Sequence, residues 1–126
     1  MQTKISEIGQ IAITVSDVKQ AMVFYRDVLK LDFLFSPSDE LAFFQCGPTR
    51  IMLSTPQGAG EIGKNSLIYF KVENIEAFYE AVIQQGAAPE REPQFAAPMP
   101  DHELWIGFVR DLDGNLVGIM EEKRSN

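Results

Sequence analysis

A short alternating strand followed at once by an amphipathic helix occurs twice in this chain, and this duplication limits the folds open to it. In IGQIAITVSDVKQAMVFYRDVLKL, residues 8–31, apolar residues occupy every second position from Ile11 to Val15. Such alternation predicts a strand with two unlike faces. Asp17 then offers a side-chain oxygen to the free amides of a helix start, and apolar residues at helical spacing follow.

The second copy is SLIYFKVENIEAFYEAVIQQG, residues 66–86, in which Asn74 takes the capping position. Equivalent residues lie at one constant spacing: Val15 with Val72, Asp17 with Asn74, and Val18 with Ile75. The chain is therefore predicted to be a tandem repeat of a βα unit, with helices near 17–30 and 74–85.

Further strands follow each helix. Three apolar runs at 31–36, 41–47 and 49–56 complete a first β-α-β-β-β module. In the second half, strands at 104–111 and 115–123 flank an Asp113-Gly114 turn. We thus expect an α+β fold of two tandem βαβββ modules, 8–56 and 66–122, which form curved mixed sheets and are joined by a glycine-rich linker, 57–65.

Four prolines between Pro89 and Pro100 interrupt the second module. Proline cannot donate to a strand ladder, so we expect a short edge strand followed by a loop. The loop from Gln94 to Glu103 is expected to close over the mouth of a pocket.

Composition excludes several function classes. A net charge of -7 and a pI near 4.6 argue against binding of nucleic acid, and they favour solubility over the alternative, a cationic ligand. No apolar run approaches the ~20 residues of a membrane span. Cys46 is the single cysteine, so an internal disulfide is impossible and a cytoplasmic location is expected.

Three motifs in this order resemble the vicinal oxygen chelate superfamily, which includes glyoxalase I, bleomycin-resistance proteins and extradiol dioxygenases. They are IGQIAITVSDV, YRDVLKLDF and RDLDGNLVGIME, with Leu31 at the usual glycine and Leu112 at the usual proline. The resemblance covers residues 8–122 and implies a single glyoxalase-like domain, 1–126. It also implies two curved sheets that together form an open barrel, helices outside, and assembly as a homodimer.

The resemblance further implies four metal-ligand positions, one on the first and last strand of each module. These positions hold Gln10, Met52, Leu67 and Gly118. Hard divalent ions prefer several oxygen ligands, and zinc or nickel prefers imidazole, carboxylate or thiolate. Only Gln10 offers an oxygen, so we predict no metal and no other cofactor; a divalent metal belongs only to the enzyme alternative below.

Strand parity places the residues at these four positions and their neighbours on the concave side of the sheets, where we predict a small-molecule pocket. The alternate residues of the same strands are uniformly apolar and are expected to face the helices. The alternative is that Met52, Leu67 and Met120 meet and fill the barrel. The predicted pocket residues are Gln10, Thr14, Arg50, Met52, Leu67, Tyr69, Trp105, Gly118 and Met120.

His102 and Glu103 are the candidate catalytic residues, since they are titratable groups beside a strand. The interpretation we favour for Asp101-His102-Glu103 is an exposed loop tip, and Trp105 is expected either to stack on a ligand or to belong to the core. Three functions follow. The first is metal-independent binding of a small aromatic or amphipathic compound. The second is a glyoxalase-like lyase or isomerase, or a dioxygenase relative, with a rebuilt site of Gln10, His102 and Glu103. The third is a structural role for a filled barrel.

Overall fold

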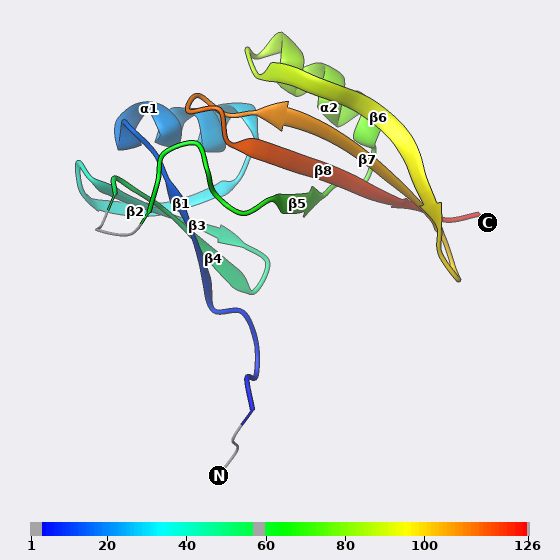
Figure 1. Cartoon of the computed structure of the whole chain (residues 1–126), viewed down its shortest axis with the longest axis horizontal. Coiled ribbons are helices and arrows are strands. Elements are labelled where there is room, and N and C mark those ends of the chain that lie inside the picture. Colours follow the sequence, from blue (N-terminus) through cyan, green and yellow to red (C-terminus); the bar gives the residue numbers. More distant parts are fainter. Residues whose placement is uncertain (1–3, 57–59, 126) are drawn as a thin grey trace. The chain divides into compact units, whose positions relative to one another are not determined.

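The computed structural model describes residues 4–56 and 60–125. The chain forms two compact units, Met1–Gly60 and Glu61–Asn126, and each unit carries one helical segment and four strands (Figure 1). Of the predicted linker, residues 57–59 lie outside the described residues, and residues 60–65 contain no helix or strand.

The first unit is one βαβββ module. Its elements are β1 (Gln10–Thr14), α1 (Val18–Val23), η1 (Phe24–Val28), β2 (Asp32–Ser38), β3 (Leu41–Cys46) and β4 (Thr49–Ser54). The strands form a sheet of order β1-β4-β3-β2, in which β1 runs parallel to β4 and the other pairs are antiparallel.

The second unit repeats this plan. Its elements are β5 (Ile68–Lys71), α2 (Ile75–Gln84), β6 (Ala88–Pro98), β7 (Glu103–Arg110) and β8 (Leu116–Lys123). The sheet order is β5-β8-β7-β6, again with the first and last strands parallel. Two mixed sheets with the same connectivity confirm the predicted tandem βαβββ fold.

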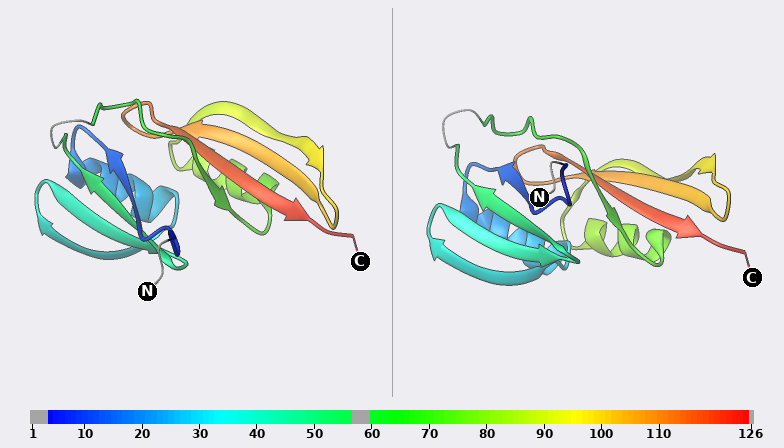
Figure 2. Two further views of the ribbon diagram at one scale, coloured as in Figure 1. Left: turned by 60° about the horizontal axis from the view of Figure 1, so that its bottom comes forward. Right: turned by 90° about the horizontal axis from the view of Figure 1, so that it is seen from below.

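Each helix covers one face of the sheet in its own unit (Figure 2). In the first unit the covered face buries Ile13, Ile51 and Leu53 completely or nearly so; in the second, Val117 and Ile119 are buried in the same way. Full burial of such side chains stabilises the fold by about 1.5–3 kcal/mol each. The predicted strand parity is thus confirmed, and the other face of each sheet is left without a helix from its own unit.

Both helices begin at the predicted caps. The Asp17 carboxylate accepts a hydrogen bond from the backbone N–H of Gln20 at 3.1 Å, and the Asn74 side chain accepts one from Ala77 at 3.1 Å. Both capping residues have extended backbones, as N-caps require.

The first helix ends in a π-helical turn, η1, followed by a left-handed residue. Lys30 has φ 65°, a region that L-residues with side chains rarely adopt. The assignment of the superfamily glycine to Leu31 is therefore wrong by one position. Lys30 is the residue whose backbone conformation favours glycine.

The loop predicted for Gln94–Glu103 is wrong up to Pro98, because β6 pairs with β7 to that residue, with three register shifts on the way. β6 is an edge strand, so only one side of its backbone must pair. Its register shifts fall beside the prolines, where the ladder is already interrupted. Gly107 on β7 makes room for this irregular strand, since a Cβ there would lie 3.2 Å from the Pro93 nitrogen.

A compact turn joins β7 to β8, as the Asp113-Gly114 pair predicted. One carboxylate oxygen of buried Asp111 accepts hydrogen bonds from the backbone N–H groups of Asp113 at 3.0 Å and Asn115 at 2.8 Å. Gly114 takes the left-handed conformation at φ 82°. Side-chain hydrogen bonds to the backbone therefore define this turn.

Candidate ligand-binding faces

The helix-free face of the first sheet gathers three of the predicted pocket residues. Arg50 Nε donates to Gln10 Oε1 at 2.8 Å, and Gln10 Nε2 donates to Met52 Sδ at 3.7 Å. The register places Gln10 beside Arg50 and Met52 opposite Phe43. The Arg50 guanidinium lies over the Phe43 ring, 5.3 Å from its centroid.

Phe43 and Phe35 belong to this face but were not among the predicted site residues. Their rings are 5.1 Å apart, and Phe35 is 51% exposed. Strand parity in LAFFQC, together with its pairing with β4, puts Phe43 on the same face as Met52 and could have identified it. Thr14, in contrast, is buried at 8% exposure and does not line an open surface.

The helix-free face of the second sheet is built around Tyr69 and Gly118. These residues pair directly, and a Cβ at Gly118 would lie 2.6 Å from Tyr69 Cδ1. The Tyr69 ring meets Phe108 edge-on at 5.8 Å between centroids, and the Arg91 guanidinium lies 6.0 Å from the Phe108 centroid. The absence of a side chain at Gly118 is what allows the Tyr69 ring to lie against β8.

The remaining pocket candidates flank this cluster. Met120 pairs with Lys71 and with Ile106 and is half-buried. Leu67 precedes β5 and is 40% exposed, close to the 43% of Tyr69. This face therefore presents apolar and aromatic surface to solvent within its unit.

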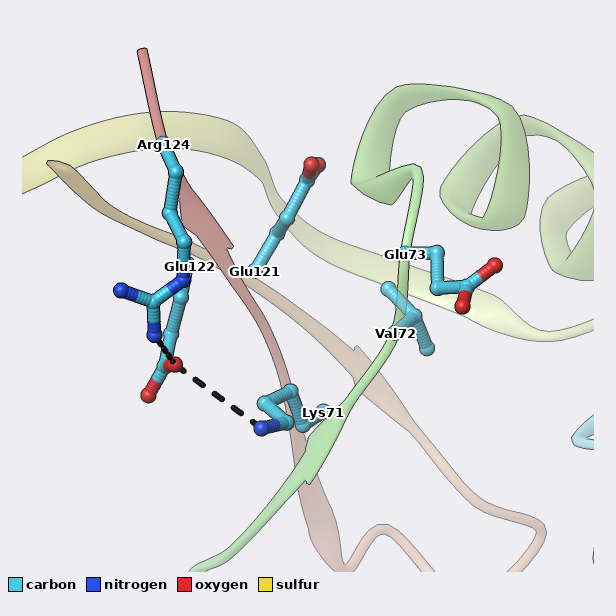
Figure 3. Close-up of a pocket in the computed structure, with 6 residues that line it drawn as sticks. All are labelled: Lys71, Val72, Glu73, Glu121, Glu122 and Arg124. Carbon is cyan, nitrogen blue, oxygen red and sulfur yellow. Dashed lines mark hydrogen bonds and ion pairs between the residues drawn. The ribbon is translucent and has the colours of Figure 1, made fainter. Parts of the chain in front are cut away.

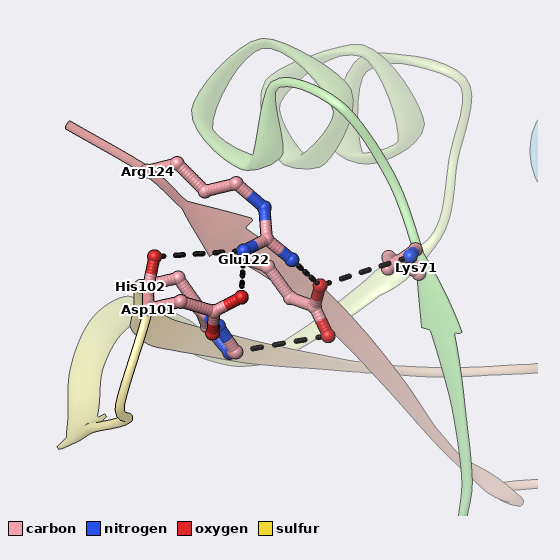
Figure 4. Close-up of polar contacts among 5 residues, drawn as sticks. All are labelled: Lys71, Asp101, His102, Glu122 and Arg124. Atoms are coloured by element: carbon pink, nitrogen blue, oxygen red, sulfur yellow. Dashed lines mark hydrogen bonds and ion pairs between the residues drawn. The ribbon is translucent and has the colours of Figure 1, made fainter. Parts of the chain in front are cut away.

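His102 is the centre of a polar network at the end of the second sheet (Figure 4). Its side chain is 10% exposed, and its Nδ1 lies 2.7 Å from a carboxylate oxygen of Asp101. Its Nε2 lies 3.9 Å from Glu122 Oε2, and Arg124 binds both Asp101 and Glu122. Hydrogen bonds from His102 and from Arg124 lower the pKa of the Asp101 carboxyl.

Beside this network is a polar cleft of about 500 Å³ between β5 and the end of β8. Figure 3 shows Glu122 held between Arg124 at 2.7 Å and Lys71 at 3.8 Å. Glu121 is occupied differently, because its carboxylate accepts the backbone N–H of Ile75 at the start of α2. The charged groups of the cleft mostly satisfy one another.

Glu103 and Trp105 lie on the other face of β7. Trp105 pairs with Glu121, which reaches the start of α2, and Glu103 accepts the Trp105 indole N–H at 3.1 Å. Lys123 also lies over the Trp105 ring, at 4.5 Å. The structure thus separates these two residues from Tyr69, Gly118 and Met120.

The four positions that the sequence resemblance predicts for metal ligands hold groups that do not fit a divalent ion. The one possible oxygen ligand, Gln10 Oε1, already accepts a hydrogen bond from the Arg50 guanidinium. The positive charge of that group would repel a metal ion. Met52 Sδ is a soft ligand, and the space beside Gly118 contains the Tyr69 ring. Among residues 4–56 and 60–125, no cluster of three or more His, Cys, Asp or Glu side chains is placed to hold an ion.

The sequence matches the model of the Glyoxalase/Bleomycin resistance protein/Dioxygenase superfamily over residues 7–119. The chain belongs to this superfamily.

Particular relatives can also be named. The protein YraH of Bacillus subtilis (strain 168) is 29% identical, in a match that covers 87% of this chain and 94% of that protein.

Two solved structures share the fold. Lactoylglutathione lyase from Agrobacterium tumefaciens superposes with a TM-score of 0.74 and 21% identity, covering 94% of this chain and 95% of its own. TnmS3, an antibiotic binding protein from Streptomyces sp. CB03234, gives a TM-score of 0.75 and 17% identity, covering 97% and 100%. The fold is therefore shared by an enzyme and by a binding protein.

Proposed function

We propose that this chain is a metal-independent binding protein for a small aromatic or amphipathic molecule. We propose as ligand-binding surface the helix-free face of each unit's own sheet, with Gln10, Arg50 and Met52 in the first unit and Leu67, Tyr69 and Met120 in the second. Thr14 and Gly118 are omitted because they are buried, and Trp105 because it lies on the other face.

The observation that carries the proposal is that the predicted metal-ligand positions do not suit a metal, while aromatic side chains on the same faces are exposed. The side-chain oxygen of Gln10 already accepts a hydrogen bond from Arg50, and the Tyr69 ring fills the space beside Gly118. Phe35 and Tyr69 nevertheless remain 51% and 43% exposed. Aromatic and methionine side chains with a few fixed polar groups are the usual lining of a small-molecule site. The antibiotic-binding relative of the same fold supports this choice.

Binding can be measured with phenylnaphthylamine, a neutral aromatic probe whose fluorescence rises in apolar surroundings. Saturable binding to the folded protein is expected, and Phe35→Ala and Tyr69→Ala should weaken it. The matched control is Phe33→Ala, since Phe33 is also exposed on β2 but its ring packs on Phe44 of the helix-covered face. Equal affinity for the variants and the wild type would contradict the proposed surface.

The absence of a metal is tested separately. Zinc, nickel or manganese should leave the melting temperature unchanged, because a ligand specific for the native state must raise it. Histidine tags must be removed first. A saturable rise with any of these ions would overturn the metal-independent assignment.

The enzyme alternative is less well supported. Gln10 is held by Arg50, and Glu103 lies on the other face of β7 from Met120. His102 has an aspartate partner on Nδ1, an arrangement that general bases use, yet Glu122 and Arg124 fill its surroundings. A catalytic role of His102 would require His102→Ala to abolish an enzymatic activity, which the binding proposal does not predict.

Assembly and location are part of the same proposal. We propose that the two modules form one domain and that the chain is a cytoplasmic homodimer. Each sheet has two edge strands, β1 and β2 in the first unit and β5 and β6 in the second, and a second copy of the chain could cover such an edge. No described helix is long and apolar enough to cross a membrane. A monomeric mass by light scattering at micromolar concentration would argue against the dimer.

A further inference from the structure

Each module places an arginine over a phenylalanine at the same position of its sheet. Phe43 on β3 lies opposite Met52, and Phe108 on β7 lies opposite Gly118. Met52 and Gly118 are the equivalent positions of the two modules. Arg50 covers the first ring at 5.3 Å, and Arg91 covers the second at 6.0 Å.

These two arginines differ from the other three in the chain. Arg26, Arg110 and Arg124 each form an ion pair, with Asp27, Glu90, and Asp101 and Glu122, respectively. Neither Arg50 nor Arg91 has a carboxylate partner among the residues that the structure describes. The chain contains 18 acidic and 11 basic residues, so carboxylates are abundant and these two guanidinium groups are the exceptions.

The geometry of Arg50 leaves its binding edge available. Its Nε donates to Gln10, which fixes the plane of the guanidinium, and the Phe43 ring supports one face. The terminal Nη groups have no hydrogen-bond partner among the described residues. A planar guanidinium held in this way presents paired donors that match a carboxylate or sulfonate in a bidentate manner.

We propose that the ligand carries an acidic group beside its aromatic part, and that Arg50 and Arg91 each recognise such a group. This inference rests on the proposed binding function and names the class of ligand: an aromatic acid. The phenyl ring beneath each arginine contacts the apolar part, and the guanidinium binds the anion. The net charge of -7 does not oppose this, because a local pair of donors, and not the distant charges, governs a short-range contact.

The test compares two probes that share one ring system. Anilinonaphthalene sulfonate is the anionic counterpart of the neutral phenylnaphthylamine. We expect wild-type protein to bind the sulfonate at least about tenfold more tightly, as charged hydrogen bonds allow. The preference should shrink as ionic strength rises.

Variants assign the preference to the arginines. Arg50→Gln and Arg91→Gln should each reduce it, and the double variant should remove it while binding of the neutral probe persists. Arg50→Lys should retain part of it, since the charge remains but the paired donors do not. Arg26→Gln is the matched control and should keep the full preference, because Arg26 pairs with Asp27 on η1. Near-UV circular dichroism must show that each variant keeps its tertiary packing, because molten states retain the far-UV signal and also bind such dyes.

The outcomes separate the two proposals. Equal affinity of wild type for both probes, or an unchanged preference in the double variant, overturns the recognition of an acid and leaves the binding function standing. Failure of both probes to bind overturns both.

Discussion

The Tyr69 ring lies against the backbone of Gly118, so close that a Cβ on Gly118 would stand 2.6 Å from Tyr69 Cδ1 and 3.0 Å from the Ile68 carbonyl oxygen. Gly118 stands at one of the four positions that the resemblance predicts for a metal ligand. An aromatic side chain has thus taken the space that a metal-binding side chain would need. A side chain at position 118 and the Tyr69 ring in its present place therefore exclude each other sterically.

Gly118→Ala should therefore destabilise the second unit by about 1–3 kcal/mol, because the Tyr69 ring and the β5 backbone must both move. Urea denaturation gives the free energy of unfolding. Tyr69→Ala in the same chain should recover part of the loss, and a double-mutant cycle measures this coupling. Gly9→Ala is the control, since a Cβ at Gly9 meets nothing within 4 Å. Additive effects of the Gly118 and Tyr69 substitutions would show that the ring is not the obstacle.

Lys30→Gly should stabilise the protein. Lys30 has φ 65°, which costs an L-residue about 1–2 kcal/mol, whereas glycine adopts it without strain. Glycine also makes the unfolded chain more flexible, so the expected net gain in unfolding free energy is about 0.5–1 kcal/mol. Lys30→Ala retains the strain and separates the backbone effect from the loss of the lysine side chain. A melting temperature for the glycine variant no higher than that of the alanine variant would refute the prediction.

Tyr79→Phe should leave stability unchanged or raise it by up to about 1 kcal/mol. Tyr79 lies on α2 at 7% exposure, and its hydroxyl meets no described residue at hydrogen-bonding geometry. Burial raises the pKa of this hydroxyl, and the Glu90 backbone is close enough to oppose that shift, but only as a weak contact. An unpaired buried hydroxyl loses its water without compensation, so its removal relieves a cost. The comparison position is Tyr25. It is also buried but is not without a partner, and its ring contacts that of Phe24. A clear destabilisation of Tyr79→Phe would mean that the hydroxyl is bonded in solution.

The Asp101 network should make stability depend on pH in the acid range. Hydrogen bonds from His102 and Arg124 lower the pKa of Asp101 in the folded state. A carboxyl whose folded pKa is depressed adds stability above its unfolded pKa, and this contribution disappears as pH falls through the folded pKa. Arg124→Gln should thus be less stable than wild type at neutral pH, and the difference should shrink below about pH 4, near the unfolded pKa of Asp. A difference that is constant from pH 7 to pH 2 would exclude this linkage. Because Asp101 is exposed, we expect a small effect.

Local patterns in the sequence were sufficient for most elements of each module, with β6 as the exception. The two alternating strands, the caps Asp17 and Asn74, and the Asp113-Gly114 turn all depend on interactions within a few residues, so they can be read without a structure. The same holds for the apolar face under each helix, because strand parity follows from the covalent chain. That Gln10, Met52, Leu67 and Gly118 are poor ligands for a divalent ion is likewise an inference from residue type alone.

Other features depended on which strands pair and in which register. The sequence determined that Gln10, Met52, Leu67 and Gly118 lack a metal-binding set, but only the tertiary structure brought Arg50 onto Gln10 and Tyr69 against Gly118. Pro89 to Pro98 form a strand because β6 lies at an edge and β7 offers Gly107 opposite its irregular part, which no local propensity can reveal. The contacts of Arg50 with the Phe43 ring and of Arg91 with the Phe108 ring are likewise made between different strands. Pairing between distant segments sets such contacts, and the energy that selects one register comes from the whole sheet and its buried face, not from any single strand.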